Sequence, residues 1–141
     1  MSKEIVDTDL RSGDLFSVQG LIFDDENLAS SGAVTSAEFM LPQAMGGVQL
    51  NVVAGAAGLA TGAGETVVVE VKTAPESGGT FDNVVFSKTI PASQTYAAKA
   101  LLADFIPPRD LAEMYAKIVV TSDYDATGQQ VSAYLVGVCK S

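Results

Sequence analysis

The side chains best able to do chemistry in this chain are carboxylates, because histidine is absent. Histidine is the commonest general base near neutral pH, the usual partner of a catalytic serine or cysteine, and a common zinc ligand. Its absence removes most hydrolase mechanisms. The single cysteine, Cys139, stands near the end of the sequence and cannot form a disulfide within the chain. We therefore expect no catalytic residues and no enzyme.

The segment 123–128 is the best local match to a metal site. Asp123, Asp125 and Thr127 alternate, and Gly128 stands sixth, as in the first half of a calcium-binding loop. The twelfth position of such a loop is Tyr134 here, where a calcium loop has a bidentate glutamate. Since Asp and Gly are also common turn formers, the pattern favours a hairpin turn. We expect no metal or cofactor, with calcium binding at this segment left open.

Two other segments carry polar or glycine-rich patterns. The densest acidic cluster is Asp24-Asp25-Glu26, but adjacent side chains diverge on a strand or turn, so a solvated loop is favoured over an acid–base pair. The glycine-rich stretch 55–64 superficially resembles a phosphate-binding loop. Glu65 stands where such a loop has its lysine, and no third glycine completes a dinucleotide fingerprint. We expect residues 55–64 to form a long, mobile loop.

The sequence predicts that the elements that position these side chains are β-strands. Val67, Val69 and Val71 alternate with more polar residues, which predicts a half-buried strand over 66–73. A Gly-rich turn joins it to a second alternating strand over 84–90, with Val84, Phe86 and Ile90 on one face. Segments 115–122 and 131–138, which flank residues 123–128, predict a terminal hairpin. Further strands are expected at 20–23, 34–41, 48–53 and 100–106, and residues 109–114 look briefly helical.

These elements predict an all-β fold, an antiparallel β-sandwich or jelly roll of about seven or eight strands. A chain of 141 residues fits one domain of this kind. Residues 20–141 are expected to form the single sandwich domain. Residues 1–19 are expected to form an extended N-terminal segment, which is either an arm laid on a neighbour or a first edge strand.

Composition excludes several classes of partner. A net charge of −9 repels phosphate backbones and anionic lipid headgroups, so we expect neither nucleic acid nor membrane as a partner. The first residues lack the apolar core of a secretory signal, so synthesis in the cytoplasm is expected. Tryptophan is absent and aromatic residues are few, which weakens the hypothesis of a sugar-binding function but does not exclude it.

The order of these pieces resembles the small jelly-roll cement, or decoration, proteins that tailed bacteriophages add to the outside of their capsids. The likeness spans about residues 20–138. It is carried by four stretches: Leu21-Ile22-Phe23-Asp24-Asp25, residues 67–73 with the following Gly/Ser loop, Phe105-Ile106-Pro107-Pro108, and residues 115–120 running into the final strand.

The resemblance implies a structural virion protein on the outer capsid surface that cements neighbouring subunits of the major capsid protein. A homo-oligomer, either a dimer or a trimer, would place several identical contacts on the shell at once. Apolar residues of the N-terminal segment and glycine-rich loops are the candidates for the partner interface: Ile5, Leu10, Leu15, Phe16, Gly46, Gly47 and Leu59. The alternatives are another non-enzymatic virion component, such as a head-fibre base or a tail part, or a sugar-binding β-sandwich.

Overall fold

The computed structural model describes residues 20–41, 48–111 and 114–137. This part of the chain contains strands and one short 3₁₀ helix, and it has no α-helix, which confirms the all-β prediction. The elements are β1 (Leu21–Asn27), β2 (Ala33–Thr35), β3 (Phe39–Met40), β4 (Val48–Ala54), β5 (Leu59–Ala60), β6 (Val67–Ala74), β7 (Asn83–Ile90), β8 (Thr95–Tyr96), β9 (Leu101–Phe105), η1 (Arg109–Leu111), β10 (Tyr115–Ser122) and β11 (Gln130–Gly137).

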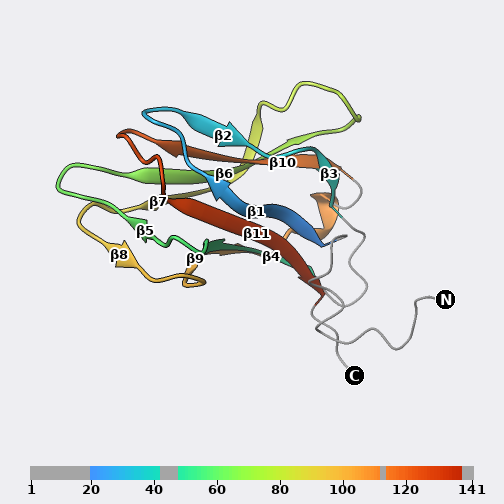
Figure 1. The fold of residues 1–141 in the computed structure, drawn as a ribbon. Coiled ribbons are helices and arrows are strands. Elements are labelled where there is room, and N and C mark those ends of the chain that lie inside the picture. Colours follow the sequence, from blue (N-terminus) through green and yellow to red (C-terminus); the bar gives the residue numbers. More distant parts are fainter. Residues whose placement is uncertain (1–19, 42–47, 112–113, 138–141) are drawn as a thin grey trace.

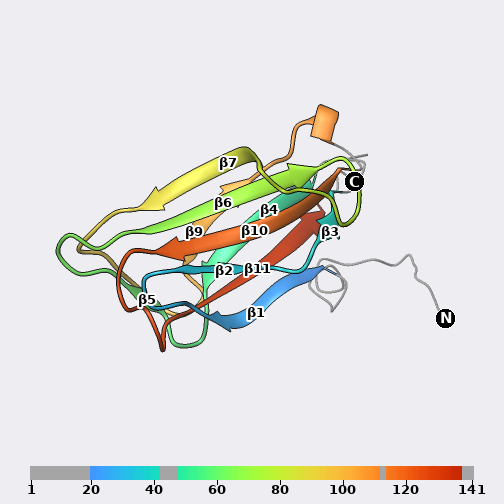
Figure 2. The same ribbon diagram turned by 90° about the horizontal axis from the view of Figure 1, so that it is seen from above.

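Two antiparallel sheets form the body of the molecule. The first sheet has the order β1-β11-β4-β9, and the second has the order β2-β10-β6-β7, with β3 also paired to β10. Figures 1 and 2 show the two sheets as the layers of a sandwich. The short strands β5 and β8 pair separately, and Figure 1 places them together at one end of the sandwich.

The strand pairing follows a simple rule once the short strands β3, β5 and β8 are set aside. Each remaining strand pairs with the one at the mirrored position in the chain: β1 with β11, β2 with β10, β4 with β9, and β6 with β7. A long antiparallel ribbon that folds over itself would produce this pairing.

The core lies between the two sheets and is built by two-residue alternation. In β10 the side chains of Ala116, Ile118 and Val120 are fully buried, while the residues between them are partly exposed. Val69 in β6 and Val131 in β11 are also fully buried. Burying one such aliphatic side chain stabilises the fold by about 1.5–3 kcal/mol, so the alternation holds the two layers together.

The predicted pairing of residues 66–73 with 84–90 is confirmed, because β6 and β7 form an antiparallel pair. The predicted terminal hairpin is wrong. β10 lies in the second sheet and β11 lies in the first, so residues 123–129 cross from one layer to the other. Turn-forming residues between two alternating strands are compatible with a hairpin within one sheet and with a connection between two sheets. Here β10 pairs with β6 and β11 pairs with β4, and these pairings place the two strands in different sheets.

The predicted strand over residues 34–41 is divided into β2 and β3. Between them the hydroxyl of Ser36 accepts a hydrogen bond from Ile118 N at 2.9 Å, while Ser36 N donates to Ile118 O at 2.9 Å. A side-chain oxygen thus stands in for the backbone carbonyl of a regular ladder. The chain keeps its place beside β10 but does not continue as one strand.

The glycine-rich stretch 55–64 contains β5 and is not an irregular loop throughout. Leu59 is only 2 % exposed and pairs with Tyr96 of β8. Gly58 has a φ of +75°, and a Cβ there would lie 2.8 Å from the carbonyl oxygen of Tyr96, so this close pairing requires glycine. Leu59 therefore belongs to the core, which corrects its place among the expected interface residues.

Candidate functional site

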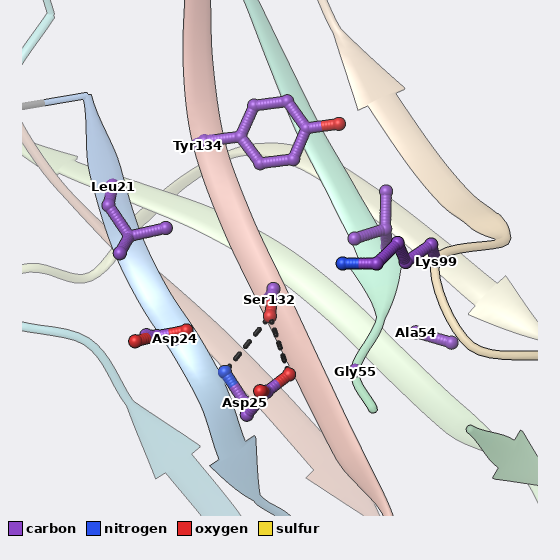
Figure 3. A pocket seen from close by; sticks show the side chains of 9 residues that line it. Leu21, Asp24, Asp25, Ala54, Gly55, Lys99, Ser132 and Tyr134 are labelled. Carbon is purple, nitrogen blue, oxygen red and sulfur yellow. Dashed lines mark hydrogen bonds between the residues drawn. The ribbon is translucent and has the colours of Figure 1, made fainter. Parts of the chain in front are cut away.

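A shallow hollow of about 370 Å³ lies on the first sheet, on the side that faces away from the second. Val131 and Ala133 point into the core, so Ser132 and Tyr134, which alternate with them on β11, point outward. Figure 3 shows the side chains that line this hollow. They come from β1, from β4 and the residue after it, from β11 and from the segment before β9: Leu21, Asp24, Asp25, Val53, Ala54, Gly55, Lys99, Ser132 and Tyr134.

A β-bulge places Asp25 in the hollow. Phe23 pairs with Ala133 and Glu26 with Val131, so two residues of β1 lie opposite Ser132 alone. Asp25 takes a left-handed backbone conformation with a φ of 50°, which turns its side chain out of the strand's regular alternation. The acidic cluster is exposed as expected, but it lies on a strand and not in a loop.

The Asp25 carboxylate is held by hydrogen bonds. Its Oδ1 accepts from Ala56 N at 3.0 Å and from Ser132 Oγ at 3.2 Å, and Asp25 N donates to the same Ser132 oxygen at 2.9 Å. The contacts with Ser132 tie β1 to β11 (Figure 3), and the bond from Ala56 ties β1 to the turn that follows β4. Since Oδ1 accepts both of these bonds, Oδ2 has no hydrogen-bond partner among the described residues.

Lys99 approaches from the other side of Ser132 (Figure 3). Its backbone is also left-handed, with a φ of 69°, and its N donates to Ala54 O at 2.8 Å. Among the described residues its ammonium group has no ion pair or hydrogen bond. Two of the four non-glycine residues with positive φ in the described part of the chain therefore line this one hollow.

The hollow is equipped for binding more than for catalysis. The Ser132 hydroxyl contacts a carboxylate, and no histidine exists to activate it. Within the described ranges, no group of three or more Cys, Asp or Glu side chains could hold a metal ion. What remains is a carboxylate and an ammonium group on opposite sides, a hydroxyl between them, and the apolar surfaces of Leu21 and Val53 beside the ring of Tyr134.

Both aspartates of the calcium-like segment accept hydrogen bonds from within the protein. Asp123 accepts hydrogen bonds from Thr66 N at 2.8 Å and Thr66 Oγ1 at 2.9 Å. Asp125 Oδ1 accepts from Thr127 Oγ1 at 2.7 Å and from Thr127 N at 3.2 Å. The bonds from Thr66 and from Thr127 lower the pKa of Asp123 and of Asp125, respectively. The two carboxylates thus serve different neighbours and do not converge on one point.

The tyrosine between these two aspartates joins the same end of the sandwich to β5. Tyr124 donates its hydroxyl proton towards Ala60 O at 2.9 Å and lies 3.0 Å from Gln129 Oε1. Burial raises the pKa of Tyr124, and the negative charges of Glu65 and Asp123 add to this shift. The phenol therefore stays protonated and remains a hydrogen-bond donor. The segment that crosses between the sheets is anchored by side chains along its length.

A second candidate region lies where β7 and β9, the last strands of the two sheets, meet. The rings of Phe86 and Phe105 are 5.0 Å apart and join the strands. Val84, two residues before Phe86, is 45 % exposed, and Ile106, directly after Phe105, is 65 % exposed. Val84 was expected on the face of Phe86, but the register between β6 and β7 shifts at this point and leaves Val84 exposed. We call Val84, Phe86, Phe105 and Ile106 the apolar edge.

The expected interface residues lie mostly outside the described ranges. This holds for Ile5, Leu10, Leu15, Phe16, Gly46 and Gly47, and for the whole predicted arm at residues 1–19. Sequence reasoning missed Lys99, because no local pattern marks a left-handed lysine before a strand. It also missed Ile106 as a candidate contact residue. The position of this apolar residue at a strand end, directly before two prolines, could have indicated that it is exposed.

Comparison with protein-family models, curated proteins and solved structures finds no match to this chain. Across residues 20–41, 48–111 and 114–137, no helix is long and apolar enough to cross a membrane. The described residues form an antiparallel β-sandwich that has an apolar edge and a polar hollow.

Proposed function

We propose that this protein is a structural virion component that binds the outside of a bacteriophage capsid and cements neighbouring subunits of the major capsid protein. The observation that carries the proposal is the apolar edge, where Val84 and Ile106 are exposed close in the chain to the Phe86–Phe105 contact that joins β7 and β9. Exposed apolar side chains along a sheet edge can contribute contact area to a protein–protein interface.

The backbone at this edge supports the same proposal. β7 and β9 each end a sheet, so each has one side without a neighbouring strand among the described residues. Unpaired N–H and C=O groups can accept a strand from another protein, and adjacent apolar side chains then add contact area. The edge thus combines backbone and side-chain means of adhesion without needing a reactive group.

The fold supports a cementing role in a more general way. The mirrored strand pairing agrees with the jelly-roll order that the resemblance implies. Of the stretches that carry the resemblance, residues 67–73 lie in β6, and Phe105-Ile106-Pro107-Pro108 begins at the end of β9, within the apolar edge. The partners we propose are the major capsid protein and further copies of this chain, as a dimer or trimer.

The proposal is tested first by location. Particles that carry the protein are isolated with an antibody against it and imaged by cryo-electron microscopy. We expect icosahedral shells with density for the sandwich on their outer surface, over junctions between capsid subunits. Density on tails or fibres alone, or no association with shells, would contradict the cementing role.

The surface is tested by adding purified variants to shells that lack the protein. An aspartate at Ile106 places a charge in the proposed contact, and we expect Ile106→Asp to lower shell occupancy at least tenfold. Met40→Asp is the matched control, because Met40 is 47 % exposed on β3, away from the apolar edge. Equal occupancy of the two variants would remove the apolar edge as the contact.

A further inference from the structure

The hollow on the first sheet has features that adhesion through the apolar edge does not use. We propose that it binds a neutral sugar ring, with Asp25 and Lys99 as the polar contacts and Tyr134 as the stacking surface. This inference does not depend on the proposed function, since the lining residues of the hollow and the residues of the apolar edge do not overlap.

The polar groups of the hollow point to hydroxyl groups as ligands. Asp25 Oδ2 is a hydrogen-bond acceptor without a partner among the described residues, and the Lys99 ammonium is a donor in the same situation. A sugar hydroxyl both donates and accepts, so neighbouring hydroxyls of one ring satisfy a carboxylate on one side and an ammonium group on the other. Such charge-assisted hydrogen bonds are stronger than bonds between neutral groups.

The mixture of charges argues against an anionic ligand. An anion would be attracted by Lys99 but repelled by Asp24 and Asp25, and a basic side chain of a partner protein would meet the reverse arrangement. A neutral polyhydroxyl compound makes favourable contacts with both signs of charge. The hollow therefore disfavours simple anions.

The apolar part of the lining and the size complete the fit. A sugar ring has carbon-bound hydrogens on its faces, and these pack on aromatic and aliphatic surfaces such as those of Tyr134, Leu21 and Val53. Small-molecule sites usually measure about 300–1,000 Å³ and combine apolar walls with a few placed polar groups. At about 370 Å³ the hollow lies at the small end of that range, which fits one ring and not an oligosaccharide.

The backbone at the two polar residues indicates that the site is pre-formed. Asp25 and Lys99 both adopt left-handed conformations, which are unfavourable for side-chain-bearing residues and persist where the surroundings hold them. The bulge and its hydrogen bonds hold Asp25, and the bond from Lys99 N to Ala54 O holds Lys99. Strain of this kind gathers at binding sites, where it fixes the position of ligand-contacting groups.

A glycan array with the full chain, displayed on beads to multiply weak contacts, is the first test. We expect binding to a subset of neutral glycans and a terminal monosaccharide that competes with them. Absence of binding to every neutral glycan, with no spectral change when neutral monosaccharides are titrated into the labelled protein in an NMR experiment, would overturn the proposal. Binding restricted to anionic glycans or to basic peptides would overturn its ligand class.

Variants then place the binding in the hollow. We expect Lys99→Gly and Tyr134→Ala each to lower binding at least tenfold, while Lys88→Ala, which removes an exposed lysine of β7 outside the hollow, leaves it unchanged. Lys99→Gly suits a left-handed position, so loss of binding in this variant cannot be assigned to misfolding, and circular dichroism confirms the fold. Undiminished binding by both hollow variants would contradict the assignment of the site.

Discussion

The apolar edge and the hollow represent two different ways of preparing a surface for contact. At the apolar edge, a ring pair joins two strands that each carry an exposed aliphatic side chain at or next to them, and nothing in the chemistry of these side chains fixes the direction of a partner. In the hollow, hydrogen bonds hold a carboxylate in place, and two residues keep unfavourable backbone conformations. The difference indicates that one region is suited to adhesion over an area and the other to recognition of a small, directional ligand.

The largest expected effect is a difference in the free energy of unfolding between two substitutions within the apolar edge. Phe105 is partly buried and packs on the core, so Phe105→Ala should destabilise the fold by about 2–3 kcal/mol. Ile106 is 65 % exposed, so Ile106→Ala should change the free energy of unfolding by less than about 0.5 kcal/mol. Urea unfolding measures both values. Similar losses in the two variants would mean that Ile106 supports the fold and is not available for a partner.

A smaller loss is expected in the hollow from Asp25→Ala. This change removes the acceptor for Ala56 N and for Ser132 Oγ and should cost about 1 kcal/mol. Asp25→Asn is the matched control, because its amide oxygen can still accept both bonds and asparagine tolerates the left-handed backbone. Chemical denaturation compares the two variants. Equal stability of Asp25→Ala and the wild type would show that these bonds do not hold the bulge.

Lys99→Gly should change the stability of the fold in the opposite direction. A left-handed lysine costs roughly 1 kcal/mol relative to glycine, so this variant should be more stable than the wild type by up to about that amount. The same variant should lose the sugar binding proposed for the hollow. Thermal unfolding gives the stability. A destabilised Lys99→Gly variant would indicate that the lysine side chain supports the fold, and would weaken the view that its strain serves binding.

Acidification should lower the stability of the fold through a segment outside both regions, the one that crosses between the sheets. The bonds from Thr66 lower the pKa of Asp123 from its ordinary value of 3.8, so the charged form stabilises the folded state. This contribution is fully present above that value and is lost as the pH falls through the lowered pKa. The melting temperature should therefore fall on acidification, and less steeply for Asp123→Asn. An unchanged slope in that variant would contradict the assignment.

Much of the fold could be predicted from the sequence because alternation records burial on one face of a strand. Val67, Val69 and Val71 are fully buried as expected, and β6 pairs with β7. The same reasoning failed for β10 and β11. A turn-forming segment between two alternating strands does not record whether the second strand returns to its own sheet or crosses to the other, since that choice depends on distant pairing partners.

The hollow was less accessible to sequence reasoning. Asp25 was singled out only as part of an acidic loop, because nothing local marks the bulge that turns it outward. Lys99 reaches the same place from a segment far away in the chain, and its left-handed backbone has no signature in its neighbours. Sites that assemble from several strands in this way depend on register, which a single sequence records only weakly.

Hydrogen–deuterium exchange of the whole chain, alone and bound to assembled shells, tests the division between the two regions most directly. We predict that shell binding slows exchange of backbone amides in β7, β9 and residue 106, while those of β1 and residues 97–100 exchange at unchanged rates. Slowed exchange confined to β1 and residues 97–100, or no change anywhere on binding, would contradict the assignment of adhesion to the apolar edge.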